Sequence, residues 1–212
     1  MRMRKKKNLI PRLERASALW VKEPETLRGQ WLAGRRERRL HLEIGCGKGK
    51  FTVSTAAAEP EALLVAVERV PEAMVIAMER AIEMELSNLL FVDMDAAFLT
   101  DAFAPREVER IYLNFSDPWP LGRHAKRRLT SPGFLEVYKQ ILAPGGEIHF
   151  KTDNAGLFAY SLEQFPACGY RLEQVTRDLH GAGVQGFMTD YEQKFHEAGT
   201  PICRCVARWE DI

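Results

Sequence analysis

An apolar run that ends in three alternating glycines occupies residues 40–50, Leu-His-Leu-Glu-Ile-Gly-Cys-Gly-Lys-Gly-Lys. Residues 40–44 have the length of a buried β-strand, and residues 50–58, after the glycines, favour a helix. A strand, a glycine turn and a helix in this order begin a β-α unit. Glycines at such a turn let the backbone bend sharply and let a ligand approach it closely.

The same alternation of strands and helices continues along the chain. Further strands are expected at residues 63–67, 89–92, 108–115 and 147–151, and helices at residues 71–86, 133–142 and 155–165. Two more strands, at residues 170–178 and 202–209, are separated by a polar segment, so we expect them to form an antiparallel pair. The sequence therefore predicts an α/β fold with a mostly parallel central sheet and an antiparallel C-terminal strand pair.

Composition and charge limit the class of protein. The chain has 212 residues, 46% of them hydrophobic, and contains no apolar run long enough for a membrane span or a secretion signal. Its four cysteines lack the spacing of a C-x-x-C pair or of a zinc site, so we expect no metal and a cytoplasmic location. Nothing in the sequence fixes the oligomeric state.

Positive charge is concentrated near the N-terminus. Residues 1–40 hold 13 of the 30 Lys and Arg residues but only 4 of the 29 Asp and Glu residues. We therefore expect a basic, partly flexible arm at residues 1–39 and one domain at residues 40–212. Such an arm suits a polyanionic partner such as RNA, although a solvated tail that binds nothing can have the same composition.

Acidic side chains follow the expected strands. Glu43 lies just before Gly45 and Gly47, Glu68 closes the second strand, and Asp95 follows the third. Ligands of open α/β sheets bind at the carboxyl ends of the strands. There, an acid about 20 residues after the glycines can accept two ribose hydroxyls, and Asp95 can accept an adenine amine. Each acid taken alone is equally suited to capping a helix.

Two details favour S-adenosylmethionine over NAD as the ligand of this edge. Lys50 stands where the dinucleotide fingerprint has Gly or Ala. The carboxylate of Glu43 would repel a pyrophosphate but suits an amino acid that carries a sulfonium. We therefore expect S-adenosylmethionine as the cofactor, with an NAD-dependent oxidoreductase as an alternative.

A stiff loop joins a cluster of cations in residues 114–128, Asn-Phe-Ser-Asp-Pro-Trp-Pro-Leu-Gly-Arg-His-Ala-Lys-Arg-Arg. The two prolines exclude a helix or a central strand, so Asp117 is expected on a rigid loop at a strand end. The cations can hold phosphates beside whatever Asp117 contacts. They are Arg123, His124, Lys126, Arg127 and Arg128.

This segment, with Leu-Glu-Ile-Gly-Cys-Gly at 42–47, Lys-Thr-Asp-Asn at 151–154 and Thr-Asp-Tyr-Glu-Gln-Lys-Phe at 189–195, resembles the bacterial tRNA (guanine-N7-)-methyltransferases. The resemblance covers nearly everything after residue 40, and the Asp-Pro-Trp-Pro and Arg-His-x-Lys-Arg-Arg strings are distinctive. It implies a Rossmann-like, S-adenosylmethionine-dependent enzyme. The implied reaction methylates N7 of a tRNA guanosine, guanosine 46 of the variable loop, to 7-methylguanosine.

The resemblance also implies roles for individual residues. It makes Asp117 the catalytic residue, and it places Glu43, Gly45, Gly47, Glu68, Asp95 and Asp117 around the cofactor. It places Asp153, Thr189, Asp190, Tyr191 and Glu192 at the substrate guanosine, and the five cations of residues 123–128 on the tRNA. From the residues alone, Thr189 and Glu192 also form an ordinary capping box. The family usually has a lysine that contacts substrate at the position of Leu121, so we assign no substrate contact to Leu121.

The chemistry agrees with this assignment. Guanine N7 has a free lone pair and can attack the sulfonium methyl group without prior deprotonation. The reaction needs in-line approach and tolerance of the positive charge that moves onto the purine, for which one carboxylate suffices. Two alternatives share the sequence features. One is a methyltransferase of the same fold with a small-molecule, protein or other RNA acceptor, and the other is an RNA-binding relative without turnover.

Overall fold

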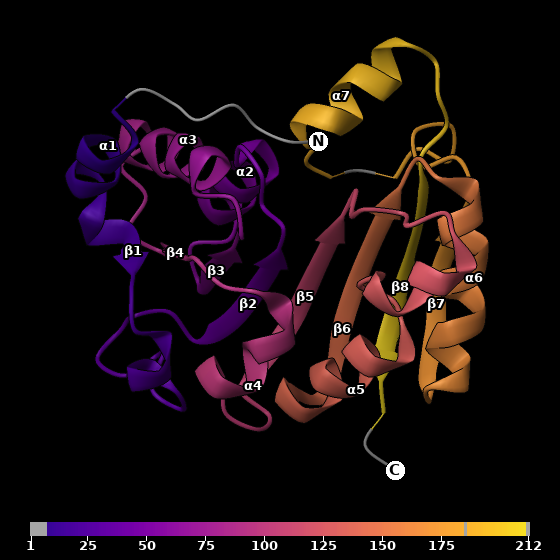
Figure 1. Ribbon diagram of the computed structural model, residues 1–212, viewed down its shortest axis with the longest axis horizontal. Helices are drawn as coiled ribbons and strands as arrows, with labels where there is room; N and C mark the ends of the chain where they lie inside the picture. Colours follow the sequence, from indigo (N-terminus) through magenta and orange to yellow (C-terminus); the bar gives the residue numbers. More distant parts are fainter. Residues whose placement is uncertain (1–7, 185, 211–212) are drawn as a thin grey trace.

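The computed structural model describes residues 8–184 and 186–210, and its framework is an eight-stranded sheet with helices on both faces (Figure 1). The strand order is β1-β4-β3-β2-β5-β6-β8-β7. β8 runs antiparallel to β6 and β7, and the other pairs are parallel. The predicted α/β class, with a mostly parallel sheet and an antiparallel C-terminal pair, is therefore confirmed.

The strands and helices expected after residue 40 occur in the expected order, and the structure adds others, among them a helix at residues 9–15, a strand at residues 20–21 and a helix at residues 190–197. The strands are β1 (Trp20–Val21), β2 (Arg39–Ile44), β3 (Ala62–Val67), β4 (Leu89–Val92), β5 (Val108–Asn114), β6 (Leu142–Thr152), β7 (Tyr170–Thr176) and β8 (Cys203–Trp209). The helices are α1 (Leu9–Arg15), α2 (Lys50–Ala58), α3 (Pro71–Glu83), α4 (Leu99–Ala102), α5 (Pro132–Ile141), α6 (Ala155–Ala167) and α7 (Asp190–Glu197). No helix among the described residues is long and apolar enough to span a bilayer.

The central strands are buried on both faces. In β3, Leu63, Val65 and Val67 belong to the hydrophobic cluster that includes α4, α5 and α6. Leu64 and Ala66, which point the other way, belong to the cluster with α1, α2 and α3. Because both faces are covered, the strand reads as an uninterrupted apolar run instead of an alternating one. This is why the sequence predicts it clearly.

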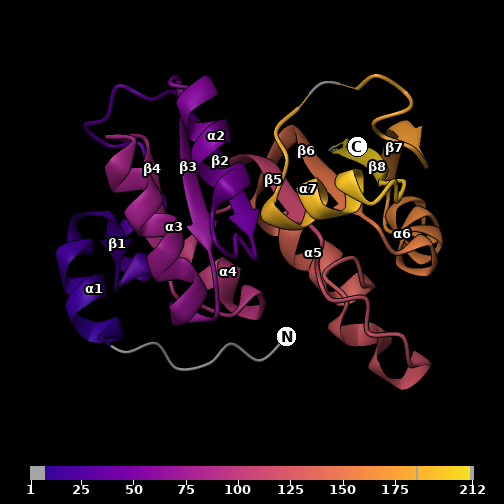
Figure 2. The same ribbon diagram turned by 90° about the horizontal axis from the view of Figure 1, so that it is seen from above.

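α7 lies across the carboxyl ends of β5 and β6, as the views from the side and from above both show (Figures 1 and 2). This helix of eight residues lies within the polar segment between β7 and β8. Thr189 caps its start, since the Thr189 hydroxyl accepts a hydrogen bond from the backbone N–H of Glu192 at 2.9 Å. The Thr189 half of the predicted capping box is therefore present, whereas the Glu192 carboxylate contacts Lys151 and His180 instead.

Most of the predicted N-terminal arm packs on the sheet. Within residues 8–39, α1 lies against α3 through paired hydrogen bonds from Arg12 to Glu79, and β1 adds a parallel edge strand beside β4. Trp31 is 2% exposed, stacks on Phe103 with ring centroids 5.1 Å apart, and donates from Nε1 to the carbonyl of Ala102. These contacts bury apolar surface, which a count of charged residues does not reveal. Residues 1–7, the densest basic cluster, lie outside the described residues.

Gly49 at the start of α2 is a position where only glycine fits. Its φ is +80°, and a Cβ there would lie 2.4 Å from the Cβ of Ala77 in α3 and 2.7 Å from its Cα. Gly49→Ala should therefore lower the free energy of unfolding by about 2–4 kcal/mol through strain and overpacking together. Urea denaturation measures the loss.

Gly47→Ala is the matched control, because Gly47 also has a positive φ of +57° but a Cβ there would meet nothing within 4 Å. It should cost only the backbone strain, about 1–2 kcal/mol. Equal losses in the two variants would show that the close approach of α2 to α3 is unimportant.

Candidate active site

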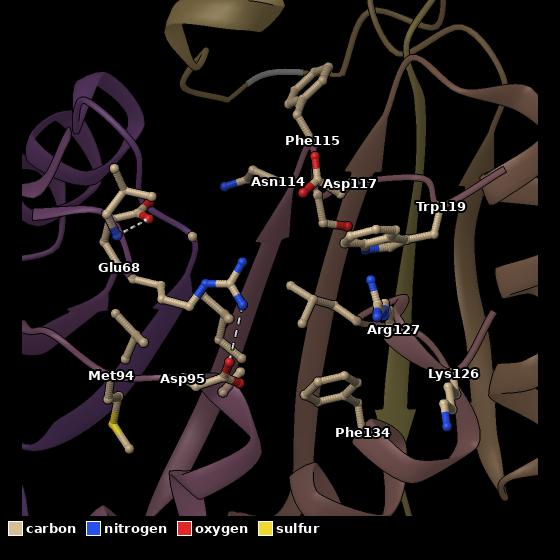
Figure 3. A pocket seen from close by; sticks show the side chains of 18 residues that line it. Glu68, Met94, Asp95, Asn114, Phe115, Asp117, Trp119, Lys126, Arg127 and Phe134 are labelled. Carbon is tan, nitrogen blue, oxygen red and sulfur yellow. Dashed lines mark hydrogen bonds and ion pairs between the residues drawn. The ribbon is translucent and has the colours of Figure 1, made fainter. Parts of the chain in front are cut away.

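A cavity of about 790 Å³ opens at the carboxyl ends of β2, β3, β4 and β5 (Figure 3). β2 is the point at which the strand order turns, since β3 and β4 lie on one side of it and β5 and β6 on the other. Ligands of open α/β sheets bind at this kind of switch point. The volume of the cavity is typical of a small-molecule binding site. The wall is formed by Ile44, Gly45, Val67, Glu68, Arg69, Val70, Met94, Asp95, Ala96, Asn114, Phe115, Ser116, Asp117, Trp119, Lys126, Arg127, Leu129 and Phe134.

The acids that follow β3 and β4 are held in fixed positions. The carboxylate of Glu68 accepts backbone hydrogen bonds from Gly47 and from Val70, both at 2.9 Å. Asp95 accepts from the backbone of Ala97 at 3.0 Å, so the helix-cap role foreseen for it is present. The structure thus brings Gly45, Glu68 and Asp95 to one cavity wall, whereas Gly47 supports that wall through Glu68.

Asn114, the last residue of β5, lies between these acids and Asp117 (Figure 3). Its side chain is 7% exposed and donates from Nδ2 to Glu43 at 3.2 Å, while its carbonyl oxygen Oδ1 is buried without a hydrogen-bond partner. A buried acceptor without a partner is costly in a native structure. The atom is thus a candidate for receiving a hydrogen bond from a ligand.

Glu43 does not line the cavity. Its side chain is 1% exposed and lies behind the cavity wall, where Thr52 donates to one carboxylate oxygen at 2.6 Å and Asn114 to the other. The structure thus places Glu43 behind the cavity wall, and the direct cofactor contact expected for it stays a prediction. Burial, offset only in part by these two hydrogen bonds, raises the pKa of Glu43 to about 7.

This pKa predicts how stability depends on pH. The folded protein holds the Glu43 proton up to about pH 7, whereas the unfolded chain releases it near the ordinary value of 4.5. The contribution of Glu43 to the free energy of unfolding therefore falls by roughly 3 kcal/mol as pH rises across this interval, and is constant above it.

Glu43→Gln should remove that fall, because the amide stays neutral and keeps an acceptor for Asn114. Urea denaturation at pH 5 and pH 8 measures the difference. The variant should resemble the parent at pH 5 and exceed its stability at pH 8. Parallel pH profiles for the two proteins would mean that Glu43 is ionised in the folded state throughout.

Asp117 lies on a loop with unusual backbone geometry. Phe115 and Trp119, two residues to either side of it, have φ angles of 53° and 40°, in the left-handed region that residues other than glycine rarely enter. Asp117 itself is exposed at the cavity, and none of the described residues makes a hydrogen bond or ion pair with its carboxylate. The loop therefore presents a free carboxylate to the cavity.

The five predicted RNA-binding cations divide into groups with different surroundings. Lys126 and Arg127 line the cavity, and Arg127 lies over the Trp119 ring at 4.9 Å. His124 meets the edge of the same ring, with centroids 5.8 Å apart. Arg123 is exposed, whereas Arg128 is directed at the backbone of the Asp117 loop.

Two of the predicted guanosine contacts on α7 are engaged with other side chains. Asp190 forms a bidentate ion pair with Arg80 at 2.9 and 3.0 Å. Glu192 is 1% exposed and accepts a hydrogen bond from Lys151 at 2.6 Å. Tyr191 is half exposed. The structure thus brings these residues to the same end of the sheet as Asp117, but it does not place Thr189, Asp190 or Tyr191 on the cavity wall.

Glu192 borders a second cavity of about 420 Å³ on the other side of Asn114, which lines both. Asp153, just after β6, lines neither cavity. Leu121, at the position where the family usually has lysine, is half exposed. Within the described residues, no group of His, Cys, Asp and Glu side chains is arranged to hold a metal ion.

Three polar or charged residues at the site illustrate what the sequence did not single out. Arg69 lines the cavity and forms an ion pair with Asp95 at 3.2 Å. Its position directly after Glu68 in the sequence is the feature that points to the site. Asn114 ends β5, and Lys151, the next-to-last residue of β6, stands opposite it in the β5–β6 register. Both occur in the quoted motifs, but a polar residue within a strand gives no sign of which face it occupies.

Known proteins resemble this chain along most of its length. A sequence profile described as "Putative methyltransferase" matches residues 37–205. The tRNA (guanine-N(7)-)-methyltransferase of Listeria monocytogenes serovar 1/2a is 44% identical over 99% of both chains. The protein of the same name from Streptococcus suis is 42% identical over 99% of this chain and 100% of its own length.

Solved structures are similar in fold at much lower identity. The 16S rRNA methyltransferase KamB superposes with a TM-score of 0.63 and 17% identity, over 88% of this chain and 92% of its own. The antibiotic-resistance methyltransferase Kmr gives a TM-score of 0.59 and 19% identity, over 85% and 90% of the two chains. At this identity the two structures show a shared methyltransferase fold alone.

Proposed function

Since this chain belongs to the tRNA (guanine-N7-)-methyltransferase family of enzymes, we propose that it transfers a methyl group from S-adenosylmethionine to N7 of a guanosine in tRNA. The proposed position is guanosine 46 of the variable loop, and the product is 7-methylguanosine. The observation that carries the proposal is the cavity at the switch point, which collects Glu68, Asp95 and Asp117 from three different strand ends.

The residues of the cavity fit S-adenosylmethionine, which would supply an electrophilic methyl group when bound. Glu68 follows β3, where a carboxylate can accept ribose hydroxyls, and Asp95 follows β4, within reach of an adenine amine. Met94 and Phe134 add apolar surface for the purine. The unpartnered Oδ1 of Asn114 can accept from the ammonium of the amino acid part.

We assign Glu43 a supporting role in this site. Its hydrogen bonds to Thr52 and Asn114 fix the Asn114 amide so that Nδ2 points away from the ligand and Oδ1 stays available. Gly45, with a φ of +82° and open space where a Cβ would stand, lets the ligand approach the backbone.

Asp117 is the proposed catalytic residue. Its free carboxylate can accept hydrogen bonds from guanine and stabilise the positive charge that develops on the purine as N7 is alkylated. The lone pair of N7 attacks, so no side chain has to remove a proton first.

The acceptor would approach from the side of α7. We propose that Asp153, Thr189 and Tyr191 contact the flipped nucleotide there, as in the family motif. Asp190 and Glu192 hold α7 through Arg80 and Lys151 in this structure, so a contact between Glu192 and guanine would have to compete with a buried ion pair. Arg123, His124, Lys126 and Arg127 are suitably placed for the tRNA backbone.

Two further expectations remain proposals. The four cysteines are free thiols, which suits a reducing cytoplasm. The basic residues 1–7, which lie outside the described residues, are proposed to contact tRNA electrostatically.

Methyl transfer into defined tRNA tests the proposal. The purified chain is incubated with labelled S-adenosylmethionine and either of two transcripts of one tRNA, with guanosine or adenosine at position 46, and nucleosides are then identified. We expect 7-methylguanosine from the first transcript only. 7-Methylguanosine from both would refute the position, and label in another nucleoside or in no tRNA would refute the acceptor.

A further inference from the structure

The loop that carries Asp117 needs support from outside itself. Phe115 and Trp119 both adopt positive φ angles, and such conformations persist in non-glycine residues only where the surroundings impose them. Phe115 is fixed by its backbone hydrogen bond to the carbonyl of Lys151 at 2.9 Å and by ring stacking on Phe195. The other end of the loop, at Trp119, requires a separate anchor.

Arg128 provides that anchor. Its Nε donates to the carbonyl of Pro118 and its Nη2 to the carbonyl of Trp119, each at 3.0 Å. These are consecutive carbonyls, and they lie directly after Asp117 in the chain. The planar guanidinium can serve both at once because its donors form a rigid fork, whereas a lysine ammonium is a point charge.

The guanidinium is itself held from behind. It lies over the ring of Tyr160 at 4.3 Å, a cation–π contact with α6. One residue along α6, the hydroxyl of Ser161 bonds that of Thr130 at 2.7 Å, both groups being fully buried. The side chain is therefore fixed between the loop and a helix of the domain core.

This position differs from that of the neighbouring cations. Arg123 is exposed and has no hydrogen bond, ion pair or ring contact within the described part of the chain, so its guanidinium is available to a phosphate. The guanidinium of Arg128 already uses two of its donor atoms on the loop and one face on Tyr160.

We propose that Arg128, backed by Tyr160, is a positioning residue that holds the Asp117 carboxylate at the cavity, and that it is not an RNA-binding residue. The proposal deepens the proposed function and rests on it for the role of Asp117. It predicts that loss of Arg128 affects the chemical step and leaves tRNA affinity unchanged.

Kinetics of methyl transfer separate the two roles. For Arg128→Gln we expect kcat to fall by about 10- to 100-fold, with the KM for tRNA and its dependence on salt as in the parent. For the matched control Arg123→Gln we expect kcat to stay at the parental value and the KM for tRNA to rise. The slope of log KM against log salt concentration should fall in magnitude by about one. A raised KM and a lower salt slope for Arg128→Gln, with kcat kept, would overturn the proposal.

Variants of Tyr160 test the support from α6. Tyr160→Phe keeps the aromatic face under the guanidinium and should keep kcat, whereas Tyr160→Leu should lower kcat in the same way as Arg128→Gln. Equal kcat values for the two Tyr160 variants would count against the contact. Thermal unfolding of each variant shows whether it is folded at the assay temperature.

Hydrogen exchange gives a readout that does not depend on activity. Exchange of the backbone amides of residues 115–121 should accelerate at least several-fold in Arg128→Gln and stay as in the parent in Arg123→Gln. Unchanged exchange in Arg128→Gln would refute the anchor. If the parent makes no 7-methylguanosine, the proposed function fails, whereas the exchange result still decides whether Arg128 holds the loop.

Discussion

Asp117→Ala is expected to lower kcat for formation of 7-methylguanosine by at least about a hundredfold, the usual effect of removing a group that stabilises developing charge. The carboxylate lies at the cavity wall and has no partner among the described residues. Its loss should therefore change the free energy of unfolding by no more than about 0.5 kcal/mol. Methyl transfer under saturating tRNA and cofactor, beside urea denaturation, measures both.

Two further variants sharpen the Asp117 result. Asp117→Asn keeps the shape and a hydrogen-bonding oxygen but removes the charge, so a loss as large as that of alanine assigns the effect to charge. Asp101→Ala removes an exposed aspartate of α4 that lies outside the site, and should keep parental turnover. Near-parental kcat in folded Asp117→Ala would remove Asp117 from the mechanism.

Lys151→Met is expected to lower the free energy of unfolding by about 3–5 kcal/mol, because it removes the ammonium from the buried carboxylate of Glu192 and leaves it, among the described residues, only His180 Nε2, at 3.3 Å, as a partner. Lys151 is 7% exposed and Glu192 1% exposed, and the ammonium also donates to the carbonyl of Phe187 at 2.9 Å. For a domain of this size, the melting temperature should fall by about 10 °C. Thermal and urea unfolding measure the change.

The double variant Lys151→Met with Glu192→Leu is the control. It removes both charges and should recover most of the lost stability, since an apolar pair of similar volume often replaces a buried ion pair without loss. If Lys151→Met alone costs less than about 1 kcal/mol, the pair behaves like an exposed one. The anchoring of α7 would then have to come from Asp190 and Arg80.

The sequence predicts the parallel core of this fold well because burial there is periodic and local. α2 and β4 have the expected bounds, and β2, β3 and β5 differ by one residue at an end. The strand expected from residue 147 begins earlier, at Leu142, because Leu142 pairs with Val108 across a register shift in the β5–β6 ladder. A register shift depends on the partner strand, and a local pattern does not contain it.

The N-terminal segment shows the opposite case. Thirteen basic residues among the first 40 dominate its composition, whereas its attachment depends on few apolar side chains, above all Trp31 against Phe103. Such contacts join residues some 70 positions apart, and no window of sequence reveals them. The packing of residues 8–39 therefore emerged only from the structure.

The site was predictable to the level of strand ends and no further. Glu68, Asp95 and Asp117 meet at one cavity because parallel strands bring their carboxyl ends together. Glu43 lies behind the cavity wall and Asn114 lies on it. This difference depends on the side of the strand to which each side chain points. Likewise, five adjacent cations look equivalent in sequence, and only their contacts separate Arg128 from Arg123.

The place of β8 in the sheet has a consequence for synthesis on the ribosome. β8 is inserted between β6 and β7, and β7 pairs with no other strand among the described residues. Until residues 203–209 emerge from the exit tunnel, the nascent chain therefore presents two unpaired strand edges, one on β6 and one on β7. Open edges of this kind invite association between chains. Chains whose translation stalls before residue 203 should therefore aggregate.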